Sequence, residues 1–178
     1  MVSAASQQPV IDLDRYVPGY LTWIANKLTR GASQAYLAAF NVGVESWRLL
    51  VLLAIERSIS AQRCSKVIGM DKASVSRAFK LMQSRGLITI SLDASDGRLR
   101  VATITAKGRQ LHNRIMAMAL ERERALLSIF DAPEREMLIR LLRRMHENLP
   151  SVEAATDRYL AEHFPKARRK AAARKEEA

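Results

Sequence analysis

Residues 60–105 read SAQRCSKVIGMDKASVSRAFKLMQSRGLITISLDASDGRLRVATIT, and this stretch determines the expected fold. Ser60 stands before a short amphipathic segment that a glycine ends, and Asp71 stands before a second such segment. Serine and aspartate are favoured helix N-caps, and glycine is favoured just beyond a helix C-terminus. The pattern predicts helices over residues 61–68 and 72–85, joined by a turn, which is typical of a helix-turn-helix.

Beyond Gly86 the spacing of the apolar residues changes from three or four to two. Residues 87–92 and 100–105 both alternate between apolar and polar side chains, which predicts two strands. The turn-forming sequence between them contains Asp96-Gly97, so we expect the tip of a β-hairpin there. A hairpin that follows a helix-turn-helix indicates a winged helix-turn-helix.

Amphipathic helices are expected on both sides of this module. Upstream, apolar residues recur at intervals of three and four over residues 16–40, and a second helix over residues 45–56 is apolar on nearly every side. A helix of that second kind lies at the centre of a core. Downstream, helical periodicity returns over residues 106–130 and again beyond residue 131.

Three residue patterns in the last part of the chain indicate where helices start and end. Asp131-Ala-Pro-Glu134 resembles a capping box and predicts the start of a helix that runs through Met145. Pro150 is expected to break or kink this helix, and Ser151 is the expected cap of a final helix that ends at residue 163. The remaining residues form a basic tail of low complexity.

The positive charge is concentrated in the central module. The 178 residues include 29 Lys and Arg against 18 Asp and Glu, a formal net charge of +11 at pH 7. Residues 57–109 hold eleven of the basic and three of the acidic residues. A strongly basic segment in an otherwise near-neutral chain indicates a polyanionic partner such as nucleic acid. A solvated basic surface is the alternative.

Other classes of function are disfavoured by composition. No apolar run approaches the ~20 residues of a membrane span, and the N-terminal residues lack a secretory signal, so a reduced, cytoplasmic location is expected. The single cysteine cannot form an internal disulfide or anchor a zinc cluster. The three histidines are far apart, and the common catalytic and phosphate-binding motifs are missing. We therefore expect no enzyme, no metal and no cofactor.

Three segments, by their order and spacing along the chain, together resemble the multiple antibiotic resistance regulator (MarR) family of bacterial transcription factors. Asp96-Gly-Arg98 followed by Leu-Arg-Val-Ala-Thr-Ile-Thr-Ala-Lys-Gly108 is similar to the family's wing signature. The other two are Trp47-Arg-Leu-Leu50, which resembles the start of the family's second helix, and Asp71-Lys-Ala-Ser-Val-Ser-Arg77 with Gly86-Leu-Ile88, which resembles its recognition helix running into the wing. Cys64 departs from the family pattern, and so does the basic tail.

The resemblance implies a mainly α (α+β) fold, a winged helix-turn-helix with long N- and C-terminal dimerisation helices. The expected parts are a flexible N-terminal arm (1–14), an N-terminal dimerisation helix (15–43), a DNA-binding winged helix-turn-helix (44–108), C-terminal linker and dimerisation helices (109–164) and a disordered basic tail (165–178). The expected function is a homodimeric regulator of transcription, a repressor with activation left open, on double-stranded DNA. Its operator would be near-palindromic with half-sites ~10 bp apart. The alternative is an architectural DNA- or RNA-binding protein without sequence preference.

The candidate DNA contacts follow from what the grooves accept. A recognition helix needs small residues at its tip, and an arginine there can bind guanine through two hydrogen bonds. Arg77 is the candidate for base contact, with a phosphate contact or a surface salt bridge as the alternative. The resemblance implies that Arg98 enters the minor groove and that Asp96 steadies it. The full set is Ser60, Gln62, Arg63, Lys72, Ala73, Ser74, Ser76, Arg77, Lys80, Asp96, Arg98 and Arg100.

Aromatic residues cluster in the first two expected helices. Tyr20, Trp23 and Trp47 are candidates to bind a small aromatic acid, phenolic or thioester effector, with Arg48 as a partner for its carboxylate. Core packing and a dimer interface are the alternative for the same residues. Cys64 is expected to be a buried small apolar residue rather than a redox sensor.

Overall fold

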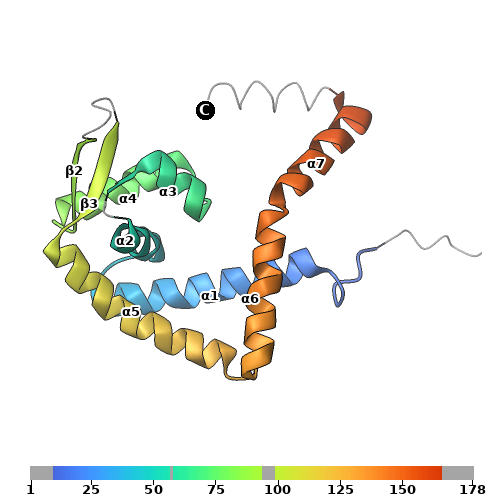
Figure 1. Cartoon of the computed structure of the whole chain (residues 1–178), viewed down its shortest axis with the longest axis horizontal. Helices are drawn as coiled ribbons and strands as arrows, with labels where there is room; N and C mark the ends of the chain where they lie inside the picture. Colours follow the sequence, from blue (N-terminus) through green and yellow to red (C-terminus); the bar gives the residue numbers. More distant parts are fainter. Residues whose placement is uncertain (1–9, 57, 94–98, 166–178) are drawn as a thin grey trace, which may run out of the picture. The chain divides into compact units, whose positions relative to one another are not determined.

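A computed structural model describes residues 10–56, 58–93 and 99–165 of the chain (Figure 1). In chain order its elements are α1 (Val17–Phe40), α2 (Val44–Ile55), β1 (Ile59–Ser60), α3 (Ala61–Ile68), α4 (Lys72–Ser84), β2 (Ile88–Leu92), β3 (Arg100–Ile104), α5 (Ala106–Leu127), α6 (Ala132–Glu147) and α7 (Leu149–His163). This order confirms the predicted mainly helical, winged helix-turn-helix fold.

The helix-turn-helix forms where its capping signals predict it. The Ser60 side chain accepts a hydrogen bond from the Arg63 backbone N–H at 3.2 Å, and α3 starts there. Gly69 ends α3 with a positive φ of 74°, a conformation that costs glycine little because it has no Cβ. Asp71 caps α4 by accepting the Ser74 backbone N–H at 2.8 Å.

The sheet is antiparallel and has the order β1–β3–β2. β2 and β3 form the predicted hairpin, in which Ile90 lies opposite Ala102. β1 was not predicted: Ile59 pairs with Ala102 on the other edge of β3. A strand of two residues is too short for alternation to be seen in the sequence.

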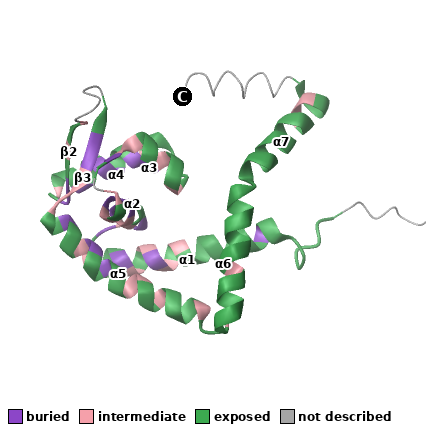
Figure 2. Cartoon of the chain, viewed as in Figure 1, coloured by how far each residue is buried: buried purple, intermediate pink, exposed green. Residues whose placement is uncertain are grey.

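α2 lies at the centre of the core, as its nearly uniform apolar surface predicts. The side chains of Leu49, Leu50 and Leu53 are fully buried. They belong to the same core cluster as Phe79 and Met82 of α4. Figure 2 shows this concentration of buried residues in α2, α4 and the sheet. Because α2 anchors α4 and the sheet from within, the outward face of α4 has a firm support.

α1 is long and only partly covered. Its buried residues are Gly19, Ala32 and Tyr36, whereas large apolar side chains of its first half remain exposed. In the described part of the chain no single helix is long and apolar enough to span a membrane. Only α1 and α2 taken together reach that length and composition, and they meet at a bend of 83°.

The chain divides into two compact units, residues 1–122 and 123–178. In the second unit, Asp131 and Glu134 form the predicted capping box at the start of α6. The prediction that Ser151 caps the last helix is wrong, because α6 ends at Glu147 and α7 begins at Leu149 with Asn148 between them. Pro150 lies in the first turn of α7, where the missing N–H is not needed.

Candidate nucleic-acid interface

The outward face of α4 carries the residues predicted to contact bases and phosphates. Ser74 is half-buried, and the exposed members of this set are Lys72, Ala73, Ser76, Arg77 and Lys80. The opposite face is buried and consists of Val75, Ala78, Phe79 and Met82. Apolar and polar residues lie on opposite sides of α4, as in any amphipathic helix. Because the apolar side packs against the core, the polar side faces solvent.

A chain of hydrogen bonds runs along the first turn of α4. Asp71 accepts the Ser74 backbone N–H at 2.8 Å, and Arg77 Nη2 donates to the Ser74 hydroxyl at 2.7 Å. Hydrogen bonds from the Ser74 side chain and backbone lower the pKa of the Asp71 carboxyl below its usual value. The Ser74 hydroxyl therefore holds the guanidinium of Arg77 beside the helix tip, where the Arg77 charge also contributes to lowering the pKa of Asp71.

The start of α3 brings together Ser60, Gln62 and Arg63, the three residues predicted there. The Ser60 hydroxyl serves as the helix cap, and Gln62 is exposed. Arg63 Nη2 forms an ion pair with Glu56 Oε1 at 3.2 Å, and both side chains are partly exposed. A phosphate contact by Arg63 would have to replace this weak surface ion pair.

The hairpin contributes Arg100, which is exposed at the start of β3. Below the tip, the Asp93 backbone N–H donates to the Leu99 carbonyl at 2.8 Å and holds the two strands together. Asp96 and Arg98, predicted for the wing tip, lie outside the described residues.

The junction between hairpin and α5 contains functional positions that the sequence reasoning did not assign. The Thr105 hydroxyl donates to the Gly86 carbonyl at 2.8 Å and accepts the Gly108 backbone N–H at 3.0 Å. Gly108 packs so closely that a Cβ would overlap the Leu87 carbonyl oxygen and come within 2.9 Å of Ile104 Cγ1. These contacts fix the end of the hairpin to the residues that follow α4.

Comparison with known proteins agrees with this geometry. A model of the MarR family matches residues 40–99. The solved structure of a MarR/EmrR family transcriptional regulator from Acinetobacter sp. ADP1 is 30% identical, with a TM-score of 0.74, and the match covers 79% of this chain and 99% of that one. The chain belongs to the MarR family of transcriptional regulators.

Two further relatives extend the comparison. The uncharacterized HTH-type transcriptional regulator YdgJ of Bacillus subtilis (strain 168) is 33% identical over 109 residues, which are 60% of this chain and 65% of that protein. The S. aureus MepR–DNA complex has the same fold, with a TM-score of 0.67 at 20% identity over 76% of this chain and 98% of that one. The matched proteins are regulators of the MarR and HTH type and not members of an enzyme family.

The candidate effector residues of this MarR-family chain fall into two groups. Tyr20 and Trp23 form an edge-to-face pair on α1, with ring centres 5.7 Å apart, and both are exposed. Trp47 is half-buried and stacks on His112 at 5.4 Å. Arg48 Nη2 donates to the Thr29 hydroxyl at 3.0 Å. Among the described residues, no ring contact joins the α1 pair to Trp47.

His112 and Tyr36 complete the aromatic group around Trp47 and were not predicted. Tyr36 lies edge-on to Trp47 at 6.0 Å, and His112 is buried with Nδ1 2.9 Å from Asn113 Oδ1. Burial raises the pKa of the Tyr36 hydroxyl, and the Arg122 charge opposes that shift. Spacing along one helix could not reveal this group, because its rings come from three helices.

Cys64 is fully buried, as the sequence predicts. Burial, with a contribution from the Glu56 charge, raises the pKa of its thiol to about 11. The thiolate is the reactive form of cysteine, so this position disfavours oxidation at neutral pH.

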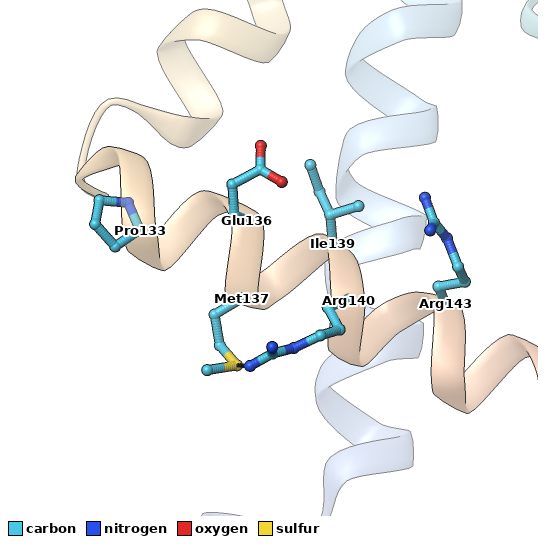
Figure 3. Close-up of a pocket in the computed structure, with 6 residues that line it drawn as sticks. All are labelled: Pro133, Glu136, Met137, Ile139, Arg140 and Arg143. Atoms are coloured by element: carbon cyan, nitrogen blue, oxygen red, sulfur yellow. Dashed lines mark hydrogen bonds between the residues drawn. The ribbon is translucent and has the colours of Figure 1, made fainter.

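Neither the hollow along α6 nor any group of metal-binding side chains among the described residues forms a candidate site. Figure 3 shows a hollow along α6, lined by Pro133, Glu136, Met137, Ile139, Arg140 and Arg143, all from one helix. Arg140 donates to the Met137 sulfur within it. Within residues 10–56, 58–93 and 99–165, no group of three or more His, Cys, Asp or Glu side chains could hold a metal ion.

Proposed function

We propose that this chain is a sequence-specific regulator of transcription that binds double-stranded DNA through the tip of α4 and the hairpin. The observation that carries the proposal is the N-terminal part of α4, where Arg77 bonds to Ser74 and the small side chains of Ala73 and Ser76 are exposed. Bulky residues at this tip would hold the helix away from the floor of the major groove. The proposed phosphate contacts are Lys72, Lys80 and Arg100. Binding to the bacterial chromosome would also place the protein in the cytoplasm.

The tip of the hairpin is the proposed second probe of the DNA. Arg98 would enter the minor groove, where a narrow A·T tract attracts a guanidinium group. Asp96 would steady that arginine. This step is supported by the Asp96-Gly-Arg98 motif in the sequence and by Arg100, which is exposed at the start of β3.

A homodimer is proposed as the binding form. Exposed large apolar residues gather on the outer helices: Val17, Tyr20, Leu21, Trp23, Ile24 and Leu28 on α1, and Met137, Leu141, Leu142 and Met145 on α6. Apolar exposure of this extent typically marks an association surface. A two-fold dimer would place two recognition helices on half-sites ~10 bp apart and require a near-palindromic operator.

Repression with release by a small aromatic or phenolic effector is the proposed mode of regulation. A ligand releases DNA only if it binds the non-binding arrangement more tightly than the binding one. Both tryptophans of the chain, Trp23 and Trp47, are candidate effector residues. Quenching of tryptophan fluorescence by aromatic acids, phenols or acyl thioesters, and its loss in Arg48→Met, would support the aromatic group as the site.

Selection of the full chain on random DNA duplexes tests the proposal. We expect enrichment of one near-palindromic sequence, a dimer bound to each duplex, and affinity that falls steeply with salt. Repression is tested by placing the selected sequence between a promoter and a reporter gene. Salt-sensitive binding that is equal for selected DNA, random DNA and RNA would instead favour the architectural alternative and overturn the proposal.

A further inference from the structure

Three of the eleven basic residues between positions 57 and 109 bind carbonyl oxygens at the ends of helices. Arg85 Nη1 donates to the Asn41 carbonyl at the end of α1, and Lys107 Nζ donates to the Arg85 carbonyl at the end of α4, at 2.8 Å. Arg109 Nη1 donates to the Ala54 carbonyl in the last turn of α2, at 3.0 Å. Carbonyls at a helix C-terminus have no partner within the helix and carry partial negative charge, so a cation is favourable there.

Each of these bonds joins a helix of the winged module to a helix that flanks it. Arg85 links the end of α4 to α1, Lys107 links α5 to the end of α4, and Arg109 links α5 to α2. The two flanking helices are also bonded to each other, because Arg122 Nη2 of α5 donates to the Leu28 carbonyl of α1 at 3.1 Å. The module is therefore tied at three helix ends to a pair of flanking helices that are themselves tied together.

Apolar packing also holds α1 and α5 against the module, but it fixes less. Tyr36 of α1 and Ile115 of α5 belong to the same core cluster as Leu49 and Phe79. Burial of apolar surface is non-directional, so it brings helices together without fixing one point on a helix to one point on its neighbour. A hydrogen bond does fix two such points, because its length and angle are restricted. Three bonds at three different helix ends therefore determine an orientation that packing alone leaves loose.

We propose that Arg85, Lys107 and Arg109 are positioning residues, which set the orientation of α4 relative to α1 and α5 and thereby the separation of the two recognition helices in the dimer. This inference rests on the proposed function, because the separation matters only if two copies bind neighbouring half-sites. Arg85 acts from the far end of the recognition helix. Because α4 has 13 residues, at about 1.5 Å per residue its C-terminal end lies ~20 Å from the tip capped by Asp71.

Operators with altered spacing test the positioning role. The full chain is titrated with the selected operator and with two versions whose half-sites are one base pair closer together or further apart, a shift of ~3.4 Å along the duplex. We expect the wild type to prefer the selected spacing. Arg85→Met, Lys107→Met and Arg109→Met should each bind the selected operator up to about tenfold more weakly, because a hydrogen bond to a charged group contributes about that much. Each should also discriminate less between the three spacings, and Arg85→Lys and Arg109→Lys should recover part of that discrimination.

Two variants separate positioning from loss of charge. Lys66→Met is the matched control, because it also removes one positive charge, from an exposed position on α3; it should keep the spacing preference of the wild type. Lys80→Met removes a proposed phosphate contact, so it should weaken all DNA sequences alike and lower the salt slope by about one. The three positioning variants should keep the salt slope of the wild type. A residue that only stabilised the fold would lower the free energy of unfolding without changing the spacing preference.

The outcomes distinguish this inference from the proposed function. A wild type that prefers one spacing, with three variants that keep this preference, overturns the inference alone. Variants that lose salt slope as Lys80→Met does would be phosphate contacts, which also overturns it. A wild type that binds all sequences equally overturns the proposed function and the inference with it. Glutamine replaces methionine at any position where circular dichroism shows the methionine variant to be unfolded, because the glutamine amide keeps a neutral donor.

Discussion

Arg77 is the residue on which the proposed base recognition depends. Because Ser74 holds its guanidinium at the tip of α4, we expect Arg77→Ala to lower affinity for the selected operator by about 1–3 kcal/mol and to relax the sequence preference. Lys80→Ala is a charge-matched comparison on the same exposed face. It should weaken all DNA sequences alike and lower the salt slope by about one. Equal behaviour of the two variants would show that Arg77 contacts only phosphate.

Cys64 is predicted to be chemically silent in the folded chain. The pKa of its thiol is raised to about 11 by burial, so the thiolate is scarce at neutral pH. Iodoacetamide should modify the native protein far more slowly than the protein unfolded in urea, and peroxide should leave operator affinity unchanged. A loss of affinity on peroxide treatment that is absent in Cys64→Ala would identify the residue as a sensor after all.

Gly108 is predicted to be the position of the hairpin junction least tolerant of substitution. A methyl group there would overlap the Leu87 carbonyl, so Gly108→Ala should lower the free energy of unfolding in urea by about 1–3 kcal/mol. Gly31→Ala is the control, because its methyl group would meet only the movable end of Arg122, at 3.3 Å. Alanine is the better helix former by ~1 kcal/mol, so this control should be neutral or stabilising. A stable Gly108→Ala would contradict the close packing.

At the scale of elements, the sequence predicts what local chemistry determines. Ser60, Asp71 and Asp131 predict the starts of three helices. Each side chain accepts the capping hydrogen bond from the backbone N–H three residues further along. β1 escapes prediction because its two residues depend on pairing with β3, which lies about forty residues further along the chain. A break is expected at Pro150, but its position at Asn148 escapes prediction because no side-chain cap marks it.

The same distinction applies to the candidate sites. The exposed face of α4 is readable from its spacing, because one helix determines both its buried and its exposed side. The aromatic group of Tyr36, Trp47 and His112 is not readable, because its three rings come from three different helices. Sequence patterns locate the chemistry that lies on one element, and tertiary structure locates the rest.

The cap of α4 predicts an acid sensitivity of its own. Hydrogen bonds with Ser74 lower the folded-state pKa of Asp71 below that of the unfolded chain. A lowered carboxyl pKa stabilises the fold above the unfolded value of about 3.9, and this contribution disappears as the pH falls through the folded-state pKa. Asp71→Asn keeps an oxygen acceptor for the cap but does not titrate. In urea titrations, the stability gap between wild type and this variant should therefore narrow on acidification below about pH 4, and a gap that is constant with pH would contradict the assignment.

At the scale of the whole molecule, the distribution of apolar surface separates two roles. The winged module closes its own core around Leu49, Leu50 and Leu53, whereas α6 and α7 bury no residue at all within the chain. Exposed apolar side chains on α6 recur at spacings of three and four, among them Leu141, Leu142 and Met145. An unpaired stripe of this kind is stable in water mainly when a second helix covers it, so the proposed dimer would also stabilise α6.

Met145→Glu tests the dimer, because it places a charge within the apolar stripe of α6. We expect the wild type to sediment as a dimer at micromolar concentration and Met145→Glu to sediment as a monomer that binds the operator more weakly, since each monomer neutralises half of the phosphates. Arg143→Glu is the comparison: it introduces the same residue two positions earlier, which at about 3.6 residues per turn points to the other side of α6. Dissociation of Arg143→Glu but not of Met145→Glu would place the interface on the wrong face of the helix, and a monomeric wild type would remove the two-fold operator from the proposal altogether.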